Sequence, residues 1–174
     1  MTFIPRGAVL TSGTIVQPIP LIRGIQSTGG NIGSNNDVYA MSMSETQTNN
    51  HRISGLPFPN GYTSGDLIFR IYWTCSFSGN LNEQVQLTYG YMFPKVGTAL
   101  GDFATTDATV LIDMETYLFD TLMAQDFTIP EVDVDLTANF IASRLSREIG
   151  VVGTEFAHSF YVHGMAWVFT GEGI

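Results

Sequence analysis

The 174-residue chain carries little charge and an excess of acid: 13% of its residues are charged and the formal net charge is −9. The single lysine, Lys95, and the six arginines form no cluster, which excludes the usual way of holding a phosphate backbone and disfavours adhesion to anionic membranes. A hydrophobic share of 44% is enough for one domain with a sizeable core.

The cysteine content and the N-terminus bear on the cellular compartment. Cys75 is the only cysteine, so no intramolecular disulfide can form, and its apolar surroundings predict a buried, unreactive thiol. Met1–Leu10 lacks the continuous apolar stretch of a signal peptide, and no run approaches the roughly 20 apolar residues of a membrane span. We therefore expect a protein that starts at Met1 and is made in a cytoplasm.

Residues 1–36 have a composition of their own. Prolines, which favour extended backbone, separate short apolar bursts, and the Gly- and Asn-rich run 29–36 is typical of a flexible connector. We expect an extended N-terminal arm over 1–36 that packs on another surface; the alternative is a pair of irregular edge strands of the same domain. The apolar arm residues predicted to make this contact are Ile15, Val16, Ile19, Leu21 and Ile22.

Residues 37–174 carry a succession of strand patterns. Val38–Ser44, Asp66–Phe77 and Glu83–Phe93 alternate between two faces. The second strand is predicted to place Leu67, Phe69, Ile71 and Trp73 on one face and Ile68, Arg70, Tyr72 and Thr74 on the other. The third is predicted to place Val85, Leu87, Tyr89 and Tyr91 on a shared face.

Turn signals separate these strands. LPFPNGY at 56–62 combines two prolines with an Asn-Gly turn. Ala108–Phe127 fits a helical stripe and an alternation equally, and its β-rich surroundings favour strands with one helical turn. FTIP at 127–130 ends a strand, and Asn139–Ser146 and Glu155–Phe169 alternate again. About eight strands with Gly/Pro corners predict an all-β fold, a jelly-roll-like antiparallel β-sandwich.

Two groups of residues resemble metal ligands. Glu131, Asp133 and Asp135 place three carboxylates on one side of an extended segment, as Ca²⁺ would require, but the bent glycine loop of such sites is missing and a solvated edge is favoured. His158 and His163 point to opposite faces of a flat strand and cannot share an ion without a bulge, for which the following glycine leaves room. The sequence predicts no metal site.

No catalytic constellation stands out. The chain has no G-x-S-x-G elbow, and His51 lies in a polar turn without an identifiable partner. Paired glycosidase carboxylates are set by the fold and cannot be recognised from their spacing. We predict that the chain is not an enzyme and needs no cofactor.

Aromatic and arginine side chains are the remaining candidates for binding. Alternating strands favour core or cross-strand roles for the aromatic residues over a sugar-stacking platform. Arg144 and Arg147 stand out because basic residues are scarce; they are predicted to pair with carboxylates at an interface, with a weak surface salt bridge as the alternative. The aromatic residues considered are Tyr72, Trp73, Tyr89, Tyr91, Tyr161 and Trp167.

The order of these motifs resembles small jelly-roll structural proteins of tailed-phage virions. The resemblance covers roughly residues 50–170. The closing segment Glu155–Gly173 departs from the pattern, because it is richer in aromatic residues and histidine. The matching pieces are Leu56–Tyr62, Asp66–Trp73, Gly79–Asn80, Val85–Tyr91, Asp126–Pro130 and Arg144–Arg147.

The resemblance implies a non-enzymatic virion protein. It suggests a capsid decoration (cement) protein that binds the outer surface of a phage capsid as a homotrimer, with the major capsid protein as its partner, after assembly in the host cytoplasm. The apolar arm residues and the two arginines would then contact the capsid or another subunit, and the binding energies of weak contacts repeated around a three-fold axis would add up. The alternative is a head-fibre or tail-attached protein that binds a host-surface glycan or receptor. Neither setting requires direct contact with nucleic acid or membrane.

Overall fold

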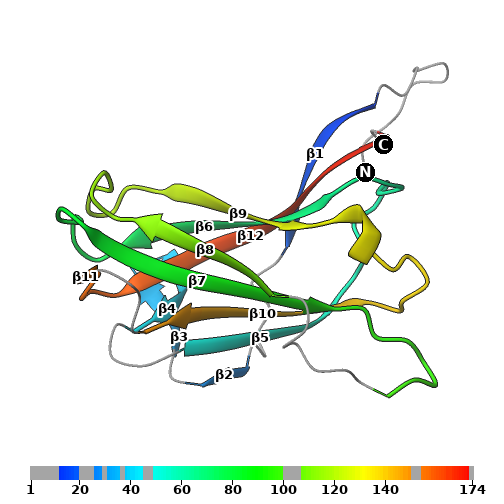
Figure 1. Cartoon of the computed structure of the whole chain (residues 1–174), viewed down its shortest axis with the longest axis horizontal. Helices are drawn as coiled ribbons and strands as arrows, with labels where there is room; N and C mark the ends of the chain where they lie inside the picture. The colour runs from blue at the N-terminus through cyan, green and yellow to red at the C-terminus, as the bar shows by residue number, and fades with distance from the viewer. Residues whose placement is uncertain are drawn as a thin grey trace.

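The computed structural model of this protein describes residues 12–19, 26–28, 31–35, 38–44, 49–99, 107–149 and 154–172. Within these residues the chain folds into two sheets of six strands each, stacked face to face as a β-sandwich (Figure 1). The pairings are antiparallel except for one short parallel pair, and a 3₁₀ turn, η2 (Glu131–Asp133), follows the ninth strand. No helix in this part of the chain has the length and apolarity needed to cross a membrane.

The first sheet is built around the long last strand. Along one edge of that strand, β4 pairs with its first residues and β1 with its second half. β6 pairs with it along the other edge. In Figure 1, β1 and the end of β12 extend together beyond the body of the sandwich. In spatial order the strands are β3 (Asn31–Asn35), β4 (Val38–Met43), β12 (Phe160–Glu172), β6 (Leu67–Cys75) and β9 (Met123–Ile129), with β1 (Ser12–Ile19) beside β12.

The second sheet is centred on two strands from the middle of the chain. The same β7 residues pair with β10 and with β8, so β7 lies between them. The strands run β2 (Gln26–Thr28), β5 (Asn49–Leu56), β10 (Ile141–Glu148), β7 (Glu83–Met92) and β8 (Asp107–Asp113), with β11 (Thr154–Glu155) pairing the start of β7. The predicted jelly-roll-like β-sandwich is confirmed.

The alternation predicted for the two clearest strands is confirmed. In β6 the four side chains predicted to face inward are all buried, and those between them face the outer side of the sheet. In β7 the four apolar side chains predicted to share a face are likewise buried. A period of two along a strand therefore divides these sequences into core and surface.

The centre of the core is an aromatic contact between the two sheets. Phe69 of β6 stacks on Tyr89 of β7 with ring centroids 4.2 Å apart, and Phe127 and Trp167 lie 6.4 and 5.6 Å from Phe69. The Tyr89 hydroxyl forms a 2.8 Å hydrogen bond with Ser143 Oγ, and burial raises the pKa of Tyr89. The buried hydroxyl of Tyr89 is thus satisfied, as a dry core requires.

Arg147 lies inside the sandwich with no exposed surface. Its guanidinium donates to the carbonyl oxygens of Met43 (3.2 Å) and His158 (2.7 Å) and to that of Phe156. The carboxylate of Glu155 lies 3.9 Å away. A buried charge needs such partners to offset its lost hydration, and here they tie the end of β4 to the segment that leads into β12.

The described parts of residues 1–36 are strands of the sandwich. β1 pairs with β12 along its whole length, β2 pairs with β5, and β3 pairs with β4. These pairings fit the alternative of edge strands of the same domain better than a separate arm. They also explain the apolar bursts, because Ile19 is buried in the core.

Elsewhere the structure sharpens or corrects the strand predictions. The ambiguous region 108–127 forms β8 and β9 with a turn between them, and β9 ends before Pro130 as predicted. The expected strand Glu155–Phe169 is divided into β11 and β12 by residues 156–159. The polar turn expected around His51 is wrong at that residue, which is fully buried in β5, because its neighbours are polar while its own side chain faces inward.

Replacing the central core ring tests the packing. Phe69→Ala is expected to lower the free energy of unfolding by about 3–5 kcal/mol, since it leaves a cavity among aromatic rings. Urea denaturation followed by the fluorescence of the two buried tryptophans measures this change. Phe77→Ala, at a side chain 58% exposed, is the control and should change stability by less than about 1 kcal/mol. Equal effects of the two substitutions would contradict the assignment of Phe69 to the core.

The buried histidine predicts a dependence of stability on pH. Burial lowers the pKa of His51, an effect opposed by a hydrogen bond with the backbone of Ser42. The unfolded chain takes up the proton first as pH falls below about 6.5, so the free energy of unfolding should then fall by up to about 1.4 kcal/mol per pH unit. His51→Leu should remove this part of the loss between neutral and mildly acidic pH, as measured by urea denaturation. Identical pH profiles for the variant and the unchanged protein would show that His51 does not contribute to this loss of stability.

Candidate functional site

The structure separates the six candidate aromatic residues into two groups. Trp73, Tyr89, Tyr91 and Trp167 are buried in the core, as the core interpretation predicts. Tyr72 of β6 and Tyr161 of β12 lie on the outer face of the first sheet and are half-buried. Tyr161 is paired with the residue two positions beyond Tyr72, so the two tyrosines are diagonal neighbours.

The Tyr72 ring leans over a position without a side chain. Gly164 of β12 is the cross-strand partner of Tyr72, and a Cβ placed there would lie 3.5 Å from Tyr72 Cδ2. The other partner of Tyr72 is Ala124 of β9, which is small and exposed. Small neighbours on both sides leave room around the ring for a flat ligand.

An arginine–carboxylate pair lies beside Tyr72. Arg70 Nε and Nη2 donate to the two carboxylate oxygens of Asp126 on β9, at 2.6 and 2.7 Å. The hydrogen bonds with Asp126 raise the pKa of Arg70, and a weaker one involves Tyr72. The two side chains keep 29% and 37% of their surface exposed. This two-point pairing holds a planar array of donors and acceptors next to an aromatic ring.

A histidine lies on the other side of Tyr72. The register of β12 against β6 shifts between Val162 and Gly164, so His163 is the extra residue of a β-bulge. The bulge that glycine was expected to allow is therefore present. His163 Nε2 lies 2.8 Å from Thr74 Oγ1, which fixes the imidazole on the outer face of the sheet.

We call this surface the tyrosine face. It combines two phenol rings, the Arg70–Asp126 ion pair, which we call the charged fork and whose charges cancel, and an imidazole hydrogen-bonded to a hydroxyl, all on the adjacent strands β9, β6 and β12 of the first sheet. Polar groups held in one orientation beside aromatic rings are suited to binding a ligand with a flat apolar side and hydroxyl groups. It consists of Arg70, Tyr72, Thr74, Asp126, Tyr161 and His163.

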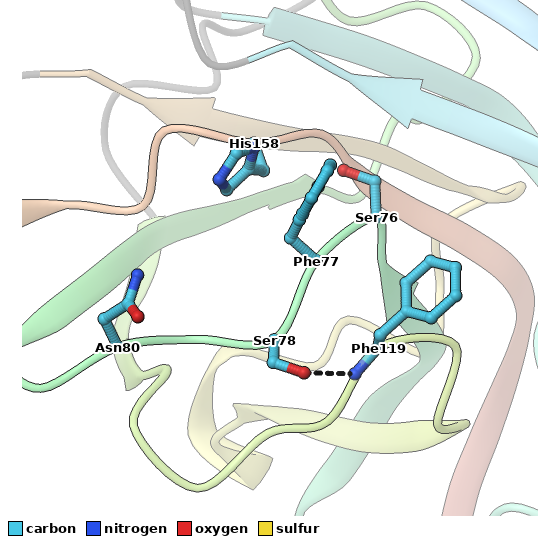
Figure 2. Close-up of a pocket in the computed structure, with 6 residues that line it drawn as sticks. All are labelled: Ser76, Phe77, Ser78, Asn80, Phe119 and His158. Atoms are coloured by element: carbon cyan, nitrogen blue, oxygen red, sulfur yellow. Dashed lines mark hydrogen bonds between the residues drawn. The ribbon is translucent and has the colours of Figure 1, made fainter.

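A second candidate lies at the end of the sandwich where β6, β8 and β12 meet their loops. It is a hollow of about 430 Å³. The Phe77 and His158 rings stack there with centroids 4.2 Å apart, and in Figure 2 the Phe119 ring lies on the other side of Phe77. We call it the loop-end hollow; it is lined by Ser76, Phe77, Ser78, Asn80, Phe119 and His158.

Four of the five groups considered as metal ligands, Asp133, Asp135, His158 and His163, have other partners. Lys95 lies 2.5 Å from Asp135 and is the main cause that lowers the pKa of that carboxyl to about 2. Asp133 accepts a hydrogen bond from Tyr91. Within the described residues no group of three or more His, Cys, Asp and Glu side chains is placed to hold a metal ion. Cys75 is buried, and burial raises the pKa of its thiol, as expected for an unreactive cysteine.

The arm residues predicted to contact a capsid or subunit differ in their positions. Ile19 belongs to the core, Ile15 packs partly against it, and Val16 is 47% exposed on the outer face of the first sheet. Leu21 and Ile22 lie outside the described residues. An interface role stays a prediction for this group.

The two arginines predicted at an interface face opposite ways along β10. Arg144 is half-buried and lies on the outer side of the second sheet. Arg147 is enclosed and bound to carbonyl oxygens of its own chain, so its guanidinium is not presented to a partner. An alternating strand puts residues three apart on opposite faces, which accounts for the difference.

Comparisons with known proteins support the fold. The sequence matches no protein-family model and no curated protein. Among solved structures the chain resembles "xylan-binding module CBM15" with a TM-score of 0.54 and 12% identity, over 92% of this chain and 100% of that one. At this identity the likeness shows the jelly-roll fold alone.

Two further structures resemble the chain more weakly. A carbohydrate-binding module specific for non-crystalline cellulose, CBM28, has a TM-score of 0.44 at 13% identity, over 83% of this chain and 80% of that one. A family 11 module from Clostridium thermocellum has a TM-score of 0.39 at 10% identity, over 98% and 96%. The likeness to the xylan-binding module supports a small jelly roll and gives no support for a virion origin.

The charged fork of the tyrosine face is expected to contribute little to stability. Partly exposed ion pairs add roughly 0–1 kcal/mol, so a double-mutant cycle of Arg70→Ala and Asp126→Ala should give a coupling energy below about 1 kcal/mol. Urea denaturation of the four proteins measures it. A coupling of several kcal/mol would show that the pair serves mainly to hold the sheet together.

Proposed function

We propose that this protein is a non-catalytic carbohydrate-binding module that holds a neutral glycan on its tyrosine face. The observation that carries the proposal is the arrangement around Tyr72, whose ring lies against Gly164 with the Arg70–Asp126 fork beside it. A sugar ring presents an apolar side to an aromatic face and directs its hydroxyls outward. The fork offers donors and acceptors for those hydroxyls without rearrangement.

The charge of the chain supports a neutral ligand. The formal net charge is −9, which disfavours approach of an anionic polysaccharide. Arg70 is already neutralised by Asp126 at 2.6 Å and is poorly placed to reverse this preference. Neutral plant-type polysaccharides such as xylan and mixed-linkage glucan are therefore reasonable first ligands, and the fold is one that a xylan-binding module also has.

The virion resemblance supplies a setting for this activity. A head-fibre or tail-attached protein that binds a host-surface glycan is consistent with both the resemblance and the tyrosine face. A capsid decoration protein, homotrimeric and bound to the major capsid protein at the capsid surface, is the second candidate. Exposed apolar side chains at the loop end, such as Leu81 at 68%, favour a contact with another protein, which supports this second candidate.

The proposal is tested by removing the tyrosines. Electrophoresis through gels that contain xylan, mixed-linkage glucan or an anionic polysaccharide reports binding as retardation. Tyr72→Ala is expected to weaken binding of a neutral glycan about ten-fold, or ~1.4 kcal/mol, and Tyr72→Ala combined with Tyr161→Ala to abolish retardation. Arg70→Lys should also weaken binding, because lysine cannot reproduce the fork.

The control is Leu111→Ala, which removes an exposed apolar side chain, 48% accessible, from the outer face of the other sheet. It should leave binding unchanged, and all variants should keep the circular dichroism of the unchanged protein. Absence of binding to a broad array of neutral glycans would overturn the proposal. Binding that survives the double tyrosine variant would move the site elsewhere.

A further inference from the structure

The loop end is unusually apolar for an exposed surface. Its large apolar side chains come from loops 76–82 and 114–122, which lie together at one end of the sandwich. Exposed apolar groups gathered in this way mark interaction sites. We call them the loop-end patch; they are Phe77 (58% exposed), Leu81 (68%), Leu118 (66%), Phe119 (57%) and Leu122 (60%).

The two loops are held together by hydrogen bonds. Gly79 N–H donates to the carbonyl of Tyr117 at 3.1 Å, and Phe119 N–H donates to Ser78 Oγ at 3.1 Å, the bond drawn in Figure 2. A Cβ at Gly79 would lie 1.8 Å from the carbonyl oxygen of Met114, so the loops touch at their backbones. The patch is thus preorganised, which lowers the entropy cost of binding.

The charges around the patch have one sign. Segments 76–83, 113–123 and 154–160 contain no lysine or arginine. Arg147, which donates to the carbonyl oxygens of His158 and Phe156 in the third of these segments, has no exposed surface. The acidic residues of these segments are Glu83, Asp113, Glu115, Asp120 and Glu155.

We propose that the loop-end patch docks a protein segment that carries an aromatic or aliphatic anchor flanked by lysine or arginine. The anchor enters the loop-end hollow, whose volume of about 430 Å³ lies within the usual range for binding pockets. The basic flanks face the acidic rim, since complementary charges direct association. A second copy of this chain is disfavoured, because it would oppose two acidic rims.

The loop-end patch and the tyrosine face are separate sites. The patch lies on loops at strand ends, whereas Tyr72 and Arg70 lie within β6 on the outer face of the first sheet. The docking proposal does not depend on glycan binding, and the two can fail independently.

The test uses a fluorescent synthetic peptide with a central Leu-Phe pair between lysines. Two comparison peptides replace either the lysines by glutamates or the Leu-Phe pair by serines. Fluorescence anisotropy of the full chain with each peptide is expected to show binding of the first only, weaker at high salt because the rim is exposed. Leu118→Ser with Phe119→Ser should weaken it roughly ten-fold or more.

Two further variants separate the contributions. Glu115→Lys should weaken binding and reduce its salt dependence, while Leu111→Ser, on the outer face of the second sheet, should change neither. Tyr72→Ala should leave peptide binding intact, and the loop-end variants should leave glycan retardation intact.

Three results would overturn the proposal: equal binding of the lysine and glutamate peptides, binding unaffected by the Leu118/Phe119 variant, or no binding of the lysine peptide. Sedimentation of the chain alone gives a fourth. Self-association that Leu118→Ser abolishes would show that a second copy occupies the patch.

Discussion

The contact between Phe69 and Tyr89 determines which residues of β6 and β7 lie on the outer faces of the two sheets. The two rings stack 4.2 Å apart across the sandwich, so β6 and β7 must present these residues inward. Successive side chains of a strand point to opposite faces, so an inward residue fixes its neighbours on the outer face. Arg70 and Tyr72 have to lie on the outer face because Phe69 and Ile71 lie inside. The proposed glycan surface is therefore a consequence of the same register that closes the core.

Local departures from the regular pattern refine these surfaces. The bulge at His163 adds one residue to β12 and brings the imidazole to Thr74. Gly164 is the next residue, and because it has no side chain the Tyr72 ring can lie against its backbone. At the loop end, Arg147 binds the carbonyl of His158, whose ring stacks on Phe77. A buried cation thus positions one wall of an otherwise apolar hollow.

Much of this fold follows from the sequence because alternation and turn chemistry are local signals. The inward and outward residues of β6 and the end of β9 at Pro130 could be predicted on that basis. Long-range pairing could not: nothing in residues 12–19 shows that they pair with the last strand, and the prolines there suggested an arm. His51 was misplaced because polar neighbours conceal an inward side chain. The tyrosine face joins β6, β9 and β12, which lie far apart in the chain, so its members could be named but not assembled.

The scarcity of basic residues makes their positions informative. Lys95 lies 2.5 Å from Asp135 at an exposed site, Arg147 is enclosed among carbonyl groups, and Arg70 is paired on the tyrosine face. In the described residues each of these three cations has an acidic or carbonyl partner. The loop-end segments 76–83, 113–123 and 154–160 contain no lysine or arginine. The tyrosine face is consequently neutral and polar, while the loop end is apolar with an acidic rim. One small sandwich thereby offers two surfaces of different chemistry, and a ligand suited to one is poorly suited to the other.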